Sequence, residues 1–121
     1  MILDSNIIIY AAIPRNEKLR DFIESNAPLV SVVSRVEVLG FRAIRPDAME
    51  YFARFFAAAG SLPVSSEVID RAVSLRQTRK MSLGDALIAA TALANDLPLV
   101  TRNTKDFEWI DSLELIDPLA A

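Results

Sequence analysis

The sequence contains no cysteine and no histidine among its 121 residues, and these two absences narrow the chemistry available to it. Without cysteine there is no disulfide, no thiolate nucleophile and no cysteine-type zinc site. Without histidine there is no Ser-His or Cys-His triad and no imidazole acid–base pair. An enzyme built from this chain must therefore use carboxylates, hydroxyls, amines or a hard metal ion held by oxygen.

Long apolar runs and an excess of positive charge are also absent. No apolar run approaches the roughly 20 residues that span a bilayer, and Asp4 interrupts the apolar first segment, which has no basic residues before it. The net charge of −3 argues against non-specific clamping of nucleic acid. A local basic rim and a bound cation would still permit a nucleic-acid substrate. We therefore expect a soluble, cytoplasmic protein without a signal peptide and without a membrane partner.

Short apolar segments alternate with longer amphipathic ones along the whole chain. The length and the 52% hydrophobic content predict a single domain over residues 1–121. Apolar segments of strand length lie at 1–3, 29–33, 62–64, 97–101 and 113–116. Helical spacing of apolar residues, with Pro, Gly and Ser at the boundaries, predicts helices over 7–13, 15–26, 34–44 and 46–60, from 66, from 82, and over 103–109. No two strands are joined by a two-residue hairpin turn, so the pattern predicts an α/β fold whose five-stranded, mostly parallel sheet is covered on both faces.

Four acidic residues come just after a predicted strand or in the helix that follows one: Asp4, Glu37, Asp85 and Asp106. Each has an ordinary structural explanation. Asp4 could cap the helix after it, and the other three lie three residues after Ser34, Ser82 and Asn103, the spacing of a capping box. An acid in a first helical turn is also favoured by the helix dipole.

Taken together, the four acids indicate something other than capping. Asp4 lies in a strongly apolar segment, and Asp85 shares a helix face with Ala89 and Ala92, which permit close approach to the sheet. In a parallel sheet, ligands bind beyond the carboxyl ends of the strands, where these helices begin. Crowded carboxylates repel one another unless a cation joins them. A set of oxygen ligands indicates Mg²⁺ or Mn²⁺ and a substrate that contains phosphate.

Basic residues accompany two of the four acids. Arg102 and Lys105 flank Asp106, and a basic stretch over 76–80 precedes Asp85. These side chains could line the rim of the site and contact a nucleic-acid backbone. Scattered Lys and Arg are also typical of an ordinary solvated surface.

The chain resembles the PIN-domain ribonucleases, specifically the VapC toxins of type II toxin–antitoxin pairs. The matching segments run nearly end to end: "ILDSNIII", "SVVSRVEVLG" and "SLGDALIAATALANDLPLVTRNTKDF". They are similar to the family's Asp-x-Asn opening, its Ser-x-x-Thr-x-x-Glu-Leu helix, and its Asp-x-x-Ile-Ala-Ala-x-Ala and Thr-x-Asn-x-x-Asp-Phe signatures. Two positions depart from the pattern, Ser5 and Ser34, where Thr is common, and both keep a hydroxyl.

The resemblance implies a role for each matching position. Asp4, Glu37 and Asp85 are similar to the three acids that hold the metal, and Asn103 and Asp106 share the candidacy for the fourth position. The catalytic set would be Asp4, Glu37, Asp85 and Asp106. Supporting polar residues that orient the carboxylates are implied at Asn6, Ser34 and Thr101.

The resemblance also implies the fold and the activity. The fold would be a three-layer α/β/α PIN-like domain. The activity would be that of a Mg²⁺- or Mn²⁺-dependent endoribonuclease that cleaves RNA by in-line attack of a metal-activated water. Two protein partners are implied, a second copy in a homodimer and a VapB antitoxin whose Arg or Lys reaches the carboxylates.

Three other functions stay open at the level of sequence. "LDSN" after the first strand is similar to the Asp-x-Asp of haloacid-dehalogenase-like phosphatases, although position 6 is Asn instead of the second Asp. A receiver-like domain that phosphorylates an aspartate also places acids and Mg²⁺ at this sheet edge, but its extra acidic pair near the first strand is missing. An inactive PIN module that only binds RNA or protein is the third alternative.

Overall fold

The computed structural model describes residues 1–120, and a five-stranded sheet runs through its centre. The strands are β1 (Ile2–Leu3), β2 (Leu29–Ser31), β3 (Ser61–Leu62), β4 (Leu99–Val100) and β5 (Leu115–Ile116). Their order in the sheet is β3-β2-β1-β4-β5, and every neighbouring pair is parallel. The prediction of a five-stranded, mostly parallel sheet is confirmed, and the short first strand lies at its centre.

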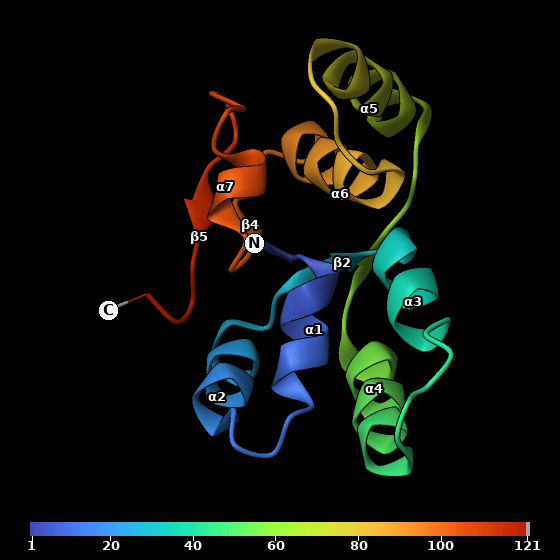
Figure 1. Cartoon of the computed structure of the whole chain (residues 1–121), viewed down its shortest axis with the longest axis vertical. Helices are drawn as coiled ribbons and strands as arrows, with labels where there is room; N and C mark the ends of the chain where they lie inside the picture. The colour runs from blue at the N-terminus through green and yellow to red at the C-terminus, as the bar shows by residue number, and fades with distance from the viewer. Residues whose placement is uncertain (121) are drawn as a thin grey trace.

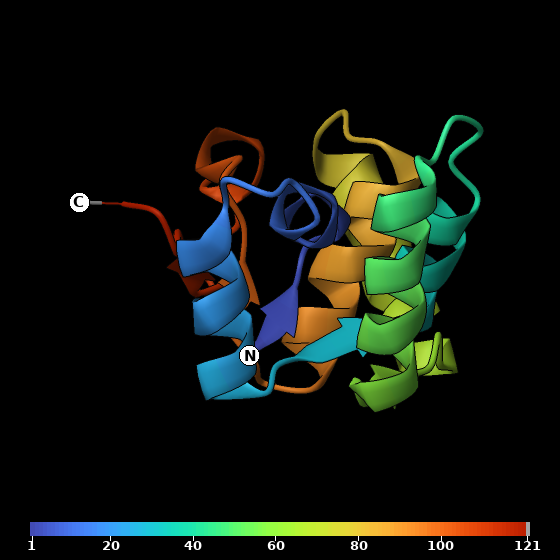
Figure 2. The same cartoon turned by 90° about the horizontal axis from the view of Figure 1, so that it is seen from below.

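Seven helices connect the strands of this part of the chain. They are α1 (Ser5–Ala11), α2 (Glu17–Asn26), α3 (Val32–Leu39), α4 (Pro46–Ala58), α5 (Ser66–Thr78), α6 (Leu83–Ala94) and α7 (Thr104–Phe107). Figure 1 shows α5 and α6 on one side of the strands and α1, α2 and α4 on the other. Figure 2, seen from below, shows α1, α2 and α4 in front of the sheet. The predicted α/β/α arrangement of three layers is therefore confirmed.

Alternating side chains of the strands divide the core into two clusters, because successive residues of a strand point to opposite faces. Ile2 and Leu99 pack with the apolar residues of α5 and α6, including Val68 and Ile88. Leu3, Val30 and Val100 pack on the other face with α1, α2 and α4. The central strands β1 and β4 are buried on both faces, which explains why their sequences read as continuous apolar runs without polar alternation.

Two helices begin earlier than the sequence predicts. The helix expected over 7–13 is α1, which begins at Ser5 directly after Asp4. The helix expected over 34–44 is α3, which begins at Val32 because Ser31 caps it by accepting a hydrogen bond from the Val33 amide at 3.1 Å. Both shifts place the polar residues 5 and 34 inside a first helical turn, close to the sheet edge.

None of the helices within residues 1–120 has the length and apolar character needed to cross a membrane.

Candidate active site

The candidate site lies at the carboxyl ends of β1 and β4, the two strands at which the chain changes direction across the sheet. From β1 the chain builds β2 and β3 on one side, and then β4 and β5 on the other. A crevice forms at such a switch point in open parallel sheets. Asp4 follows β1, and Thr101 follows β4, so both point into this region from adjacent strands.

Asp4 is almost completely buried, with 3% of its surface exposed. The Thr101 hydroxyl donates a 2.8 Å hydrogen bond to Asp4 Oδ2, and the Asn103 amide donates to Thr101 Oγ1 at 3.0 Å. Burial raises the pKa of Asp4 from its ordinary 3.8 to about 6, since the charged form loses its hydration. The Thr101 hydrogen bond opposes this rise, whereas the charges of Asp85 and Glu37 add to it. Asp4 is therefore a buried carboxylate that a nearby cation would stabilise.

Glu37 is oriented by a hydroxyl that comes from another helix. Ser5 Oγ lies 2.7 Å from Glu37 Oε1 and 2.9 Å from Ser34 Oγ, and these contacts join α1 to α3. Ser34 is completely buried. The predicted capping box of Ser34 and Glu37 is wrong, because Ser31 caps α3 and Ser34 lies three residues after this cap, already within the first turn. Sequence reasoning did not assign Ser5 to the site, although its hydroxyl directly after Asp4 was the available signal.

Gly84 brings the backbone of α6 against the Glu37 carboxylate. A Cβ placed at Gly84 would overlap Glu37 Oε2. Glycine in the first turn of a helix gives up helix propensity relative to alanine, so its presence in "SLGD" was a signal that sequence reasoning missed. The absence of a side chain at 84 allows α3 and α6 to present Glu37 and Asp85 to the same space.

Asp85 and Asp106 form the second part of the site. Ser82 caps α6 by accepting a 3.1 Å hydrogen bond from the Asp85 amide, which confirms the predicted cap at Ser82. Burial raises the pKa of Asp85, and the charges of Asp106 and Glu37 raise it further, while the Ser82 side chain lowers it. Asp85 therefore interacts electrostatically with both Glu37 and Asp106, and it links the two parts of the site.

The other predicted caps and supporting residues have mixed outcomes. Asp4 and Asn103 occupy N-cap positions, but neither side chain makes a capping hydrogen bond, so the capping explanation fails for both. Thr101 holds Asp4 and Ser34 contacts Ser5, as residues that orient carboxylates would. Asn6 is exposed and makes no side-chain hydrogen bond within residues 1–120. Its supporting role stays a prediction.

The carboxylates are neighbours without forming a closed cluster. Within residues 1–120, no group of three acidic side chains is close enough to serve as a complete metal site by itself. This spacing suits Mg²⁺, which usually keeps several waters and takes only one or two protein carboxylates besides substrate phosphates. The donor set is also all oxygen, and Asp4 is a buried carboxylate without a cationic partner in the residues described. These residues fit a hydrated Mg²⁺ or Mn²⁺ ion.

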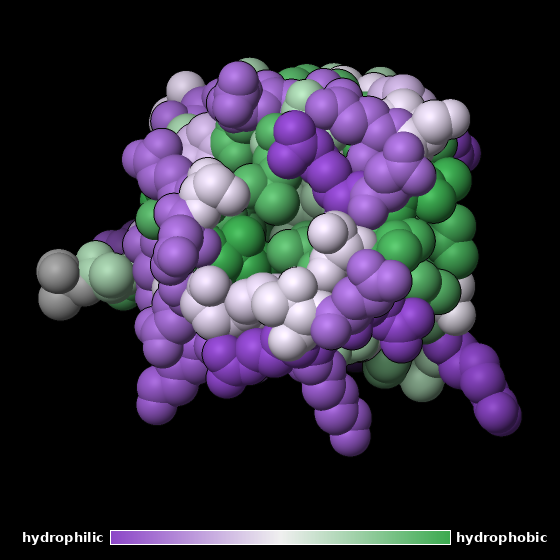
Figure 3. All heavy atoms as spheres, turned by 90° about the horizontal axis from the view of Figure 1, so that it is seen from above, coloured by the Kyte–Doolittle hydropathy of each residue, from purple (hydrophilic) through white to green (hydrophobic). Residues whose placement is uncertain are grey.

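A cavity of about 650 Å³ opens beside the second part of the site, and Asp85 and Asp106 line one side of it. Its cationic residues are Arg76, Arg79, Lys80 and Lys105. Seen from above, the face over α5, α6 and α7 is hollowed at its centre, with polar side chains around the rim (Figure 3). The basic rim that the sequence predicts for residues 76–80 and for Lys105 therefore does meet the acids.

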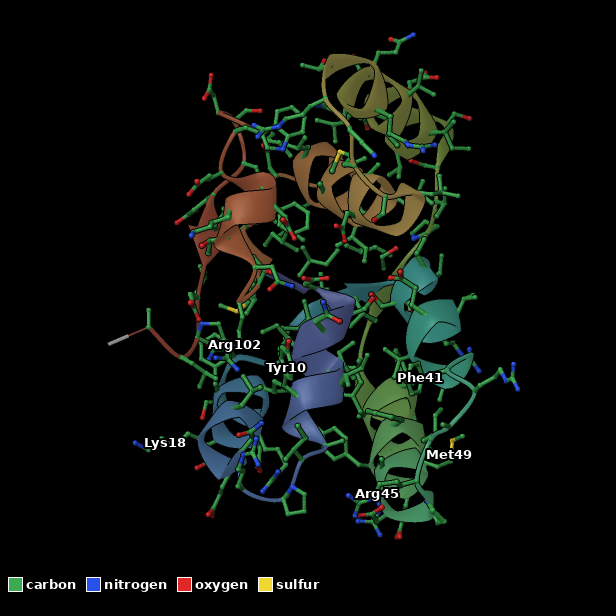
Figure 4. All side chains as sticks on the ribbon, viewed as in Figure 1. Tyr10, Lys18, Phe41, Arg45, Met49 and Arg102 are labelled. Atoms are coloured by element: carbon green, nitrogen blue, oxygen red, sulfur yellow. The ribbon has the colours of Figure 1, made fainter. Side chains whose placement is uncertain are left out.

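Arg102, which the sequence also predicts for the basic rim, does not line this cavity. It lies on the side of β4 that faces α1. Its guanidinium carbon is 5.2 Å from the centre of the Tyr10 ring, and Figure 4 shows the two side chains near one another.

Residues 1–113 match the family model described as the PIN domain. The chain belongs to the PIN-domain family. This PIN domain is 31% identical over 123 residues to the ribonuclease VapC10 of Mycobacterium tuberculosis, with 94% of this chain and 90% of that protein covered.

Solved structures agree with this assignment. A toxin–antitoxin complex from Klebsiella pneumoniae contains a chain that is 28% identical, with a TM-score of 0.77 and with 99% of this PIN domain and 98% of that chain covered. The VapBC2 structure from Rickettsia felis, bound to a DNA fragment from its promoter, superposes with a TM-score of 0.81 at 22% identity. It covers 95% of this chain and 96% of the other, and at that identity it supports the fold alone.

Proposed function

We propose that this PIN domain is a Mg²⁺- or Mn²⁺-dependent endoribonuclease of the VapC type. The observation that carries the proposal is the buried Asp4, held by Thr101 and surrounded by the charges of Glu37 and Asp85 at the sheet's switch point. A buried carboxylate among other carboxylates is stabilised by a bound cation. The 31% identity to a ribonuclease over 94% of the chain supports RNA as the substrate.

Each carboxylate has a role in the proposal. Asp4, Glu37 and Asp85 hold the hydrated metal, one or two of them directly and the others through its bound waters, and Asp106 fills the fourth position. Asp106 is preferred to Asn103 because its charge raises the pKa of Asp85 and it lines the same cavity. Asn103 contributes its backbone N–H, which donates to Thr101 Oγ1 and helps to position that side chain.

The residues of the chain would position the phosphodiester and the attacking water. The bound ion supplies positive charge that activates water and offsets negative charge on the phosphoryl oxygens. Thr101 and Ser5 fix the directions of the Asp4 and Glu37 carboxylates, so that these are arranged before substrate binds. The carboxylates favour deprotonation of a water that attacks phosphorus in line with the leaving oxygen.

A VapB-type antitoxin is part of the same proposal. The Klebsiella pneumoniae relative is a toxin–antitoxin complex, and an antitoxin Arg or Lys that reaches Asp4 and Asp85 would neutralise the carboxylates as a metal does. We also propose a homodimer. Val36, Val73 and Leu83 expose large apolar side chains on α3, α5 and α6, of which α6 contacts the other two, and a second copy would cover such side chains.

The family match over residues 1–113 does not favour the phosphatase-like or receiver-like alternatives. A covalent phosphoaspartate at Asp4 would support them. Only a measurement of RNA cleavage distinguishes an inactive PIN module from a nuclease.

Cleavage of structured RNAs by the purified full chain, free of antitoxin, tests the proposal. We expect cleavage in Mg²⁺ or Mn²⁺ that EDTA abolishes and that Asp4→Asn reduces by roughly a thousandfold, the scale of losing a principal electrostatic group. Asp21→Asn, on the exposed surface of α2, is the matched control and should cleave normally. No metal-dependent cleavage, or equal cleavage by Asp4→Asn, would contradict the nuclease.

A further inference from the structure

The cavity beside Asp85 and Asp106 has a second set of residues that the carboxylate chemistry does not use. Its volume of about 650 Å³ is bounded by the end of α5, the start of α6, and α7. Carboxylates line one side, and the remaining wall carries Arg76, Arg79, Lys80, Lys105 and Trp109. A phosphodiester chain that reaches the carboxylates from this direction would pass the cations first.

Trp109 is the one tryptophan of the sequence, and it is fixed to the candidate site. Its Nε1 donates a 3.0 Å hydrogen bond to the Asp106 carbonyl, so the indole holds a set position beside a proposed metal residue. The ring is half-buried. The guanidinium carbon of Arg79 lies 5.7 Å from the ring centre, over its face. A flat aromatic surface therefore lies next to the carboxylates, beneath the Arg79 side chain.

The four cations of the cavity have no carboxylate partners in the part of the chain that the structure describes. The ion pairs found there are Arg45–Asp47, Arg54–Glu50 and Arg71–Glu67, all exposed and all away from the cavity. Arg79, Lys80 and Lys105 are exposed. A row of unpaired cations beside an aromatic ring is the combination with which proteins bind single-stranded nucleic acid.

We propose that this cavity binds the nucleotide adjacent to the cleaved bond of a single-stranded RNA. The base stacks on the Trp109 ring, and Arg79 moves from the ring to the neighbouring phosphate, with Lys80 and Lys105 on the same backbone. This inference rests on the proposed ribonuclease function. Trp109 and Arg79 are positioning residues, because they touch the substrate away from the reacting phosphorus.

The exchange of Arg79 for a base is favourable on ordinary grounds. An exposed cation–π contact is weak, whereas a stacked base combined with a charge-assisted contact to phosphate is stronger. Stacking on Trp109 requires a base that is not already stacked in a duplex. The cavity therefore selects single-stranded segments, such as loops, over paired RNA.

Tryptophan fluorescence tests the stacking directly, because the signal has a single source. The host is Asp4→Asn, in which cleavage is suppressed, and the probe is a labelled single-stranded RNA of mixed sequence and about 12 nucleotides. We expect saturable quenching of Trp109 that follows the anisotropy of the label. A duplex of the same sequence should quench much less.

Substitutions in the same host assign the contacts. Arg79→Ala should weaken the Kd about tenfold and Trp109→Ala about tenfold, while Trp109→Phe should keep most of the affinity. Lys18→Ala and Phe41→Ala are matched controls for loss of a cation and of an aromatic ring. Figure 4 places both far from α7, on α2 and after α3, and their affinity should not change.

The kinetics of cleavage by proteins that retain Asp4 distinguish substrate binding by Trp109 from a purely structural role. Trp109→Ala should raise KM about tenfold with little change in kcat. Replacing the base next to the cleaved bond by an abasic site should slow wild type but not Trp109→Ala.

RNA that binds without quenching Trp109, or an abasic effect equal in wild type and Trp109→Ala, would overturn the proposal while leaving the ribonuclease intact. Absence of both RNA binding and metal-dependent cleavage would overturn the two together.

Discussion

The two pairs of carboxylates in this PIN domain are supported in different ways. Asp4 and Glu37, the long-range pair, are held by Thr101 and Ser5, partners 97 and 32 residues away in the sequence. Asp85 and Asp106, the local pair, depend on their own helix starts, with Ser82 only three residues before Asp85. The local pair also faces cations and an open cavity. We infer that the long-range pair sets the geometry of the site and that the local pair meets the substrate.

Within the local pair we expect the two acids to differ in their effect on cleavage, and the loss at Asp85 should be as large as that expected for Asp4→Asn. Asp85→Asn removes the carboxylate that interacts with both Glu37 and Asp106, and we expect cleavage to fall by roughly a thousandfold. Asp106→Asn should cost about tenfold, because its carboxylate is more exposed. Cleavage rates at saturating Mg²⁺ measure both. Equal losses would mean that the pair acts as one unit.

The long-range pair can be tested through pH. The pKa of Asp4 is about 6 in the folded protein and 3.8 ordinarily, so between these values the folded protein binds a proton that the unfolded chain has released. Stability from Asp4 is thus fully present below about pH 3.8, declines as pH rises, and is lost above about pH 6. Two pKa units correspond to ~3 kcal/mol.

Urea unfolding of the metal-free protein at about pH 5 and about pH 7 measures this contribution. Wild type should lose stability over this range relative to Asp4→Asn, whose side chain does not titrate. The same pH dependence in both proteins would show that the environment of Asp4 is not the one described.

The contact between the two pairs can be broken at Gly84. A Cβ there overlaps Glu37 Oε2, so Gly84→Ala should displace the carboxylate and reduce cleavage about a hundredfold. Stability should stay level or rise by up to about 1 kcal/mol, because alanine favours the helix. Cleavage and thermal unfolding measured together make the test. If Gly84→Ala retains full activity, Glu37 does not need its present position.

The smallest effect should come from one supporting hydroxyl. Ser5→Ala frees Glu37 and leaves the buried Ser34 without its partner, and we expect about a tenfold loss of cleavage and about 1 kcal/mol of stability. Ser5→Thr is the matched control, since it keeps the hydroxyl. If Ser5→Ala cleaves RNA as fast as wild type at every Mg²⁺ concentration, Ser5 does not support the site.

The difference between local and long-range support also explains what could be predicted from the sequence. The succession of strands and helices along the chain, the position of Asp4 after β1 and the Ser82 cap follow from periodicity and spacing within a few residues. The capping box of Ser34 and Glu37 was wrong because Ser31 competes for the same helix start. The contacts of Ser5 and Gly84 with Glu37 were missed because they join different helices, and only the packed fold brings these together.

The two serines beside Glu37 have a consequence for proton direction. A hydroxyl carries one proton, and an ionised carboxylate only accepts. Ser5 therefore donates its one hydrogen bond to Glu37, and Ser34 donates the hydrogen bond between the two serines. The three groups form a short chain of hydrogen bonds that runs from the buried Ser34 to Glu37 in the site. The direction in which the buried Ser34 hydroxyl points is therefore set by a carboxylate with which it makes no hydrogen bond.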